Sequence, residues 1–99
     1  IDTAMAGPSA QDMFSAAVYY LQNGQDINKA KIWIDKAVEI TAAQPRFWYL
    51  RQQSLIHAKV GSTKTAIAAA KMSLELATKA GNDAYINMNT ISLKEWGAI

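Results

Sequence analysis

The sequence predicts an all-α fold, and three observations lead to this prediction. Apolar residues recur every three to four positions in successive segments, as they do along one face of an amphipathic helix. No segment alternates apolar and polar residues for long enough to indicate a strand. Alanine, which has the highest helix propensity, is abundant, whereas the chain contains only two prolines and five glycines.

Composition limits the size and class of the protein. The chain of 99 residues has the size of one domain, and its net charge is +2. It contains no cysteine, which excludes disulfides and thiolate metal sites. No apolar run approaches the roughly 20 residues that span a bilayer, so membrane insertion is not predicted. Because the chain begins at Ile1 without methionine, we expect it to be a piece of a longer or processed protein.

The first two predicted helices form one hairpin. Ser9 can cap a helix from about Ala10 to Asn23, and Gly24 ends that helix because glycine adopts the left-handed conformation at low cost. Asp26 is the next capping residue, and it precedes a helix predicted over about Ile27 to Ala43. The apolar stripe of this second helix comprises Ile27, Ala30, Ile34, Ala37, Val38 and Thr41.

The next two predicted helices form a second hairpin. A helix is predicted over about Arg46 to Val60, and Gly61 ends it. Ser62 or Thr63 then caps a longer helix that runs to about Ala80. This helix carries a ridge of small residues, which are Ala66, Ala69, Ala70, Ser73 and Ala77.

A fifth helix, from about Ala84 to Trp96, is predicted to cover the open end of the second hairpin. Its inward positions are predicted to be Tyr85, Met88, Ile91, Ser92 and Trp96. The predicted organisation is a flexible lead-in followed by a single helical repeat domain. The boundaries are 1–8 for the lead-in, 9–99 for the domain, about 9–44 and 45–81 for its two units, and 83–96 for the capping helix.

The sequence GSTKT at residues 61–65 invites comparison with a phosphate-binding loop. Such a loop needs G-x-x-x-x-G-K-[ST] after a strand, because a glycine before the lysine lets backbone N–H groups approach phosphate. Thr63 stands in place of that glycine, and the preceding segment is predicted to be a helix. We therefore interpret GSTKT as the turn between two helices.

The residue types needed for catalysis or metal binding are sparse. His57 is the only histidine, and we interpret it as a packed or groove-lining residue and not as a base. Asp35 and Glu39 lie one helical turn apart, where they are predicted to form surface pairs with Lys31 and Lys36. The sequence therefore predicts no enzyme, with no catalytic residue, no cofactor and no metal site.

Two further patterns allow a binding role as well as a structural one. Five basic residues and no acid lie between Ile40 and Leu74, which would form an anion-attracting surface if they shared a face. Arg46, Arg51 and Lys59 do not share one helical face, so solvated positions are favoured. The aromatic residues would form a stacking platform for nucleic acid, but most fit core positions. No nucleic-acid partner is predicted.

Two segments of the chain repeat one pattern, in which a polar turn precedes an alanine and an apolar stripe. Ala30 matches Ala66, 36 residues later, and Ala37 matches Ser73. This pattern resembles the tetratricopeptide repeat, whose period is about 34 residues. The resemblance implies a right-handed α-α superhelix of two hairpins and a capping helix. It also implies that small residues let the helices approach closely, at Ala17, Ala30, Ala37, Ser54, Ala66 and Ser73.

A second resemblance covers nearly all of the chain from Ala16 onward. The segments YYLQNGQDINKAKIWIDKAVEI, FWYLRQQSLIHAKVG, AIAAAKMSLELATKAGNDAY and MNTISLKEW are similar to the C-terminal helical part of an uncharacterised family of exported bacterial proteins. Members of that family carry a β-rich domain of unknown function before this part. The resemblance implies that the present chain lacks that domain and that the protein is located in the bacterial cell envelope or periplasm.

Helical repeats without catalytic residues favour a non-catalytic interaction module of a larger bacterial protein. Its partner would be a protein, a peptide or an adjoining domain of the same chain. The first helices of such units line a concave groove, and the predicted contact residues are Tyr19, Trp48, Arg51, Gln52 and His57. An exposed apolar end on the first helix would also allow a homodimer. Two alternatives remain open, namely a structural segment that stabilises an adjoining domain and an accessory part of an enzyme.

Overall fold

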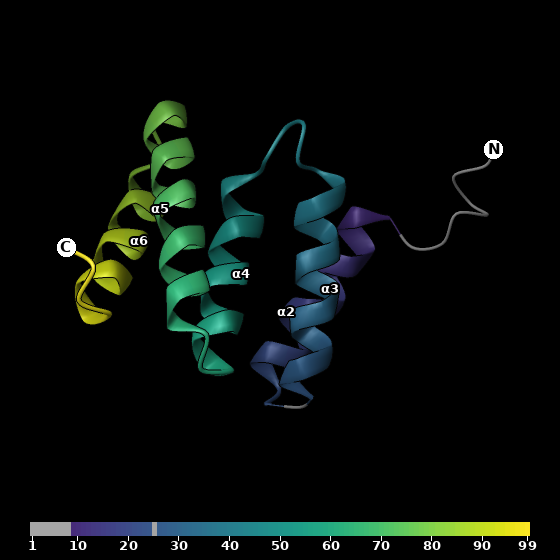
Figure 1. The fold of residues 1–99 in the computed structure, drawn as a ribbon. Coiled ribbons are helices and arrows are strands. Elements are labelled where there is room, and N and C mark those ends of the chain that lie inside the picture. Colours follow the sequence, from purple (N-terminus) through teal and green to yellow (C-terminus); the bar gives the residue numbers. More distant parts are fainter. Residues whose placement is uncertain (1–8, 25) are drawn as a thin grey trace.

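The structure is a computed structural model that describes residues 9–24 and 26–99. This part of the chain is all-α, which confirms the predicted fold class of about five helices (Figure 1). The predicted lead-in at residues 1–8, and Gln25 in the first turn, lie outside the described residues. The helices are α2 (Ala10–Gln22), α3 (Ile27–Ile40), α4 (Phe47–Lys59), α5 (Thr63–Ala80) and α6 (Asp83–Glu95).

Hydrogen bonds from side chains fix the starts of several helices. Ser9 Oγ accepts the N–H of Asp12 at 3.2 Å, and Asp12 Oδ2 accepts the N–H of Ser9 at 3.3 Å, which together form a capping box. Asp26 and Asn82 cap α3 and α6 through their own side-chain oxygens. Ser62 stands at the cap position of α5, as predicted, but its side chain makes no capping hydrogen bond.

Helix α3 ends at Ile40, before the predicted end at Ala43. The hydroxyl of Thr41 donates to the carbonyl oxygen of Ala37 at 2.8 Å, and turns replace the helix from this residue onward. Pro45 disfavours the α conformation of the residue before it, so the chain leaves the helix before reaching the proline.

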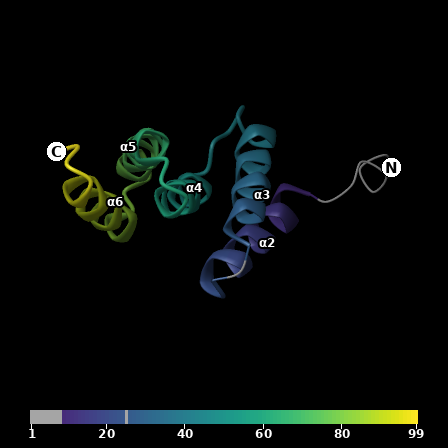
Figure 2. The same ribbon diagram turned by 60° about the horizontal axis from the view of Figure 1, so that its bottom comes forward.

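The helices form two layers, one of α2, α4 and α6 and the other of α3 and α5 (Figure 2). Consecutive helices pack side by side, so that α2 with α3 and α4 with α5 make two hairpins and α6 packs on α5. Helix α4 also contacts α2 and α6, whereas α3 and α5 do not contact each other within the described chain. In Figure 2, α4 lies between α3 and α5. None of the described helices is long and apolar enough to cross a bilayer.

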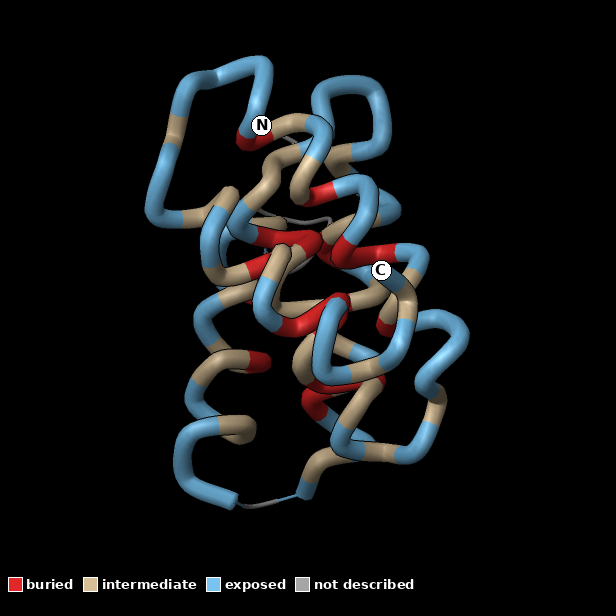
Figure 3. The backbone as a smooth tube through the Cα atoms, turned by 90° about the vertical axis from the view of Figure 1, so that its left-hand side faces the viewer, coloured by how far each residue is buried: buried red, intermediate tan, exposed pale blue. Residues whose placement is uncertain are grey.

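Small side chains fill the contacts between the helices. The predicted burial of the small residues is confirmed, because each is 0% exposed: Ala17, Ala30, Ala37, Ser54, Ala66 and Ser73. Short side chains at a helix–helix contact allow the axes to come close together. Figure 3 shows buried segments turned toward the interior and exposed segments on the outside. Larger buried residues complete the core, notably Ile34, Tyr49, Ile56 and Leu93.

The predicted inward face of helix α6 is correct except at one position, since Tyr85, Met88 and Trp96 are half-buried. Ile91, a predicted inward position, is 58% exposed. Leu93 and Asn89 are fully buried instead, and Ser92 is buried as predicted. Polar residues of α6, described below, bind groups of α4 and α5.

Candidate partner-binding groove

Arg51, which was predicted to contact a partner, forms hydrogen bonds within the molecule. Its Nη1 donates to Ser92 Oγ at 2.8 Å, to the carbonyl oxygen of Met88 at 3.2 Å and to Asn89 Oδ1 at 3.4 Å. All three acceptors belong to α6. Burial lowers the pKa of Arg51, although a guanidinium keeps its charge at neutral pH. Arg51 therefore joins α4 to α6.

The same polar network continues into α5. Asn89 is fully buried, and its Nδ2 donates to Ser73 Oγ at 2.9 Å. The Ser73 hydroxyl donates in turn to the carbonyl oxygen of Phe47 at 2.7 Å. Three helices thus share one chain of hydrogen bonds. Sequence reasoning gave Ser73 only a small-residue role, since a serine on an apolar stripe does not reveal its partner.

His57 joins α4 to α3. It is 5% exposed, and its Nε2 lies 2.8 Å from Asp35 Oδ1, which also accepts from Gln53 Nε2 at 3.0 Å. An ionised carboxylate only accepts, so Nε2 carries the hydrogen. This geometry confirms a packed histidine. The predicted pairing of Asp35 with Lys31 and Lys36 is wrong, because no ion pair between Asp35 and a lysine occurs among the described residues.

An apolar groove lies between α3 and α5, with α4 as its floor. It has a volume of about 210 Å³. The backbones of α3 and α5 do not approach each other closely, and α4 lies between them (Figure 2). Met72 on one wall is 49% exposed, whereas Leu50 on the floor is 3% exposed. The lining residues are Val38, Leu50, Gln53, Thr65, Ala68, Ala69 and Met72.

A carboxylate stands at the α3 edge of this groove. Gln53, which lines the groove, binds Asp35 at 3.0 Å. The side chain of Asp35 is 41% exposed. Its hydrogen bonds to Gln53 and His57 both use Oδ1, so that Oδ2 has no hydrogen-bond partner in the described part of the chain. The floor helix therefore fixes the carboxylate from below and leaves one oxygen open.

The other predicted contact residues lie outside the groove. Trp48 and Gln52 are each two positions from Leu50, which places them about 200° around α4 from the groove floor. Trp48 is 37% exposed and Gln52 is half-buried. Tyr19 lies on α2 and is 56% exposed. Their predicted contacts with a partner stay predictions, and they do not share a surface with the groove.

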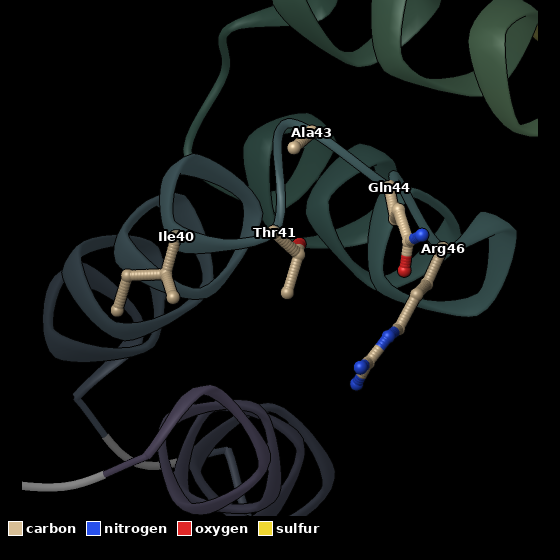
Figure 4. A pocket seen from close by; sticks show the side chains of 5 residues that line it. All are labelled: Ile40, Thr41, Ala43, Gln44 and Arg46. Atoms are coloured by element: carbon tan, nitrogen blue, oxygen red, sulfur yellow. The ribbon is translucent and has the colours of Figure 1, made fainter. Parts of the chain in front are cut away.

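A second hollow, of about 390 Å³, lies at the connection between α3 and α4. In Figure 4, the side chains of Ile40, Thr41 and Arg46 point to the same side. Arg46 Nη1 donates to the hydroxyl of Tyr49 at 3.1 Å, and its guanidinium lies 5.2 Å from the centre of that ring. The hydroxyl of Thr41 is bound to the α3 backbone. This hollow is the weaker candidate, because the Thr41 hydroxyl and the Arg46 guanidinium already have partners.

Comparison with protein-family models, with curated proteins and with solved structures found no match to this chain. The resemblances to tetratricopeptide repeats and to an exported bacterial family therefore stay predictions. Across residues 9–24 and 26–99, no three His, Cys, Asp or Glu side chains gather as the ligands of a metal ion do.

Proposed function

We propose that this protein is a non-catalytic module that binds another protein through the groove between α3 and α5. The observation that carries this proposal is an open apolar groove in a small helical domain. Leu50 and Ala69 form buried parts of its surface, and Met72 leaves half of its side chain in water. Exposed apolar concave surfaces are typical of protein-binding sites.

The polar groups of the molecule favour binding over catalysis. A histidine held by a carboxylate can act as a general base only if its other nitrogen reaches a substrate. The Nδ1 atom of His57 is buried and makes no hydrogen bond in the described chain. The Arg51 guanidinium is bound to α6. These groups support the packing of helices and leave the groove apolar.

Selection from a random peptide library tests this function. We expect peptides that bind the wild-type protein to lose affinity for Met72→Asn by about tenfold, because the substitution places a polar amide on the groove wall. Ile91→Asn is the matched control, because Ile91 is 58% exposed on α6 and does not line the groove. If selected peptides bind both variants equally well, the groove is not the binding surface.

The first hairpin also exposes large apolar side chains, which favours a second candidate function. Tyr19, Ile32 and Ile40 are 56%, 64% and 54% exposed, and all three belong to α2 or α3. This observation favours docking of an adjoining domain or of a second copy of the chain, as the sequence led us to expect. Comparing the stability of the full-length protein with that of its isolated parts tests this role. Large mutual stabilisation supports it, and independent unfolding of the parts contradicts it.

A further inference from the structure

The class of ligand that fits the groove follows from the chemistry of its walls, and this inference rests on the proposed function. Binding by strand addition needs an exposed sheet edge, and no strand occurs in the described residues. Polyproline segments dock on aromatic side chains, and phosphorylated motifs dock on arginine clusters. The groove lining contains neither an aromatic residue nor an arginine. Of the modes that bind an internal segment of a partner, docking of an amphipathic helix fits an apolar groove between helices.

The groove walls suit an approaching helix. Thr65, Ala68 and Ala69 give α5 a wall of short side chains, which permits a close approach of helix axes. Met72 adds a flexible, polarizable side chain of the kind that adapts to varied apolar partners. Such a helix would lie over α4, with α3 and α5 on its two sides.

Charge selects among amphipathic helices. The open Oδ2 of Asp35 lies at the α3 edge of the groove. Glu39 is exposed one helical turn further along the same helix. The groove lining itself contains no lysine or arginine. We propose that the groove binds an amphipathic helix of a partner protein whose apolar stripe is flanked by lysine or arginine, which pairs with Asp35 and Glu39.

A pair of synthetic helices tests this proposal in solution. The probe is a labelled peptide of about 18 residues with leucines at i, i+3, i+4 and i+7 and lysines beside the stripe. Its counterpart carries glutamates in place of the lysines. Fluorescence anisotropy with the whole chain should show binding of the lysine peptide about tenfold tighter than binding of the glutamate peptide. The preference should decrease at high salt concentration, because the charges are near the surface.

Variants assign the preference to the groove. Glu39→Gln should weaken binding of the lysine peptide about threefold without disturbing an internal contact, and Asp35→Asn should weaken it further. Glu95→Gln on α6 is the matched control and should leave affinity unchanged, because α6 does not contact α3. Met72→Asn should weaken both peptides. Circular dichroism and thermal unfolding identify any variant that has lost its fold.

The outcomes separate this proposal from the proposed function. If both peptides bind equally and Met72→Asn weakens both, the groove binds helices without regard to charge, and the cationic partner is ruled out while the binding function stands. If neither peptide binds, the helix proposal is overturned, and the library selection decides the function. If the chain dimerises and Met72→Asn dissociates the dimer, the occupant is a second copy and the proposal fails.

Discussion

At the scale of single residues, the arginine and histidine side chains form contacts within the molecule. Arg51 binds α6, and His57 binds Asp35 of α3. Arg46 lies over the ring of Tyr49. The sequence predicted solvated positions for both arginines, and this prediction was wrong for Arg51 because its partners lie about 40 residues away in the chain. No local pattern indicates such a partner.

Removal of the Arg51 side chain should destabilise the protein. We expect Arg51→Ala to lower the free energy of unfolding by about 2 kcal/mol, because hydrogen bonds to a charged group contribute about 1.5–3 kcal/mol. The loss should be equal at about pH 5 and pH 9. Burial lowers the pKa of Arg51, but a guanidinium keeps its charge throughout this range. Urea unfolding measures both values.

Lys59→Ala is the matched control for Arg51→Ala, because Lys59 is exposed near the end of the same helix. Its effect should stay within about 0.5 kcal/mol. Groove binding should survive in folded Arg51→Ala, since Arg51 faces α6. An Arg51→Ala protein as stable as the wild type would show that the hydrogen bonds between Arg51 and α6 contribute nothing to stability.

The hydroxyl group of Ser73 should contribute more to stability than the small size of this side chain does. We expect Ser73→Ala to cost about 1–3 kcal/mol, because Asn89 Nδ2 loses its acceptor in a fully buried position. Thr78→Ala on α5 removes an exposed hydroxyl that bonds only within its own helix, and it should cost less than about 0.5 kcal/mol. Equal losses in the two variants, measured by thermal unfolding, would falsify the structural role of the network.

At the scale of elements, helix starts and most helix ends could be predicted because capping chemistry is local. Ser9 and Asp26 cap as predicted. The end of α3 was predicted too late, because the helix ends at Ile40 and turns occupy the residues that lead to Pro45. The inward face of α6 was also predicted wrongly at Ile91. Asn89 and Ser92 bond to other helices, and periodicity cannot reveal such partners.

The end of α5 depends on a glycine. Gly81 has φ +71°, and the N–H of Asn82 donates to the carbonyl oxygen of Ala77 at 2.9 Å, which is the Schellman arrangement. A Cβ at Gly81 would meet no neighbouring atom, so backbone strain alone sets the cost. We expect Gly81→Ala to cost about 1 kcal/mol and Gly81→Asn to cost less. Chemical denaturation orders the two variants, and an equal or reversed order contradicts this account.

At the scale of the whole molecule, α4 is the element on which both hairpins depend. Its Tyr49 stacks on Phe14 of α2 with ring centres 4.5 Å apart, and its Ile56 belongs to a core cluster with Ala30 and Ile34 of α3. On its other side, α4 packs against α5 and α6. The apolar stripes predicted that these helices stack, because each hairpin alone leaves its apolar face in water.

The groove could not be predicted from the sequence. It exists because α3 and α5 do not meet over α4, and the distance between two helices of one layer is set by the packing of a third. Sequence reasoning placed partner contacts on the first helices of the hairpins, at Trp48 and Gln52. The groove instead lies between the second helices, where Met72 is exposed.

Methyl NMR of the methionines tests the central claim, which is that a helix binds between α3 and α5. Met72 lines the groove, whereas Met13 is buried in α2 and Met88 lies on α6. Addition of the lysine-flanked peptide to protein with carbon-13 methyl groups on methionine should shift the Met72 signal and leave the Met13 and Met88 signals in place. A constant Met72 signal, together with a shift of Met88 or Met13 on binding, would contradict the account.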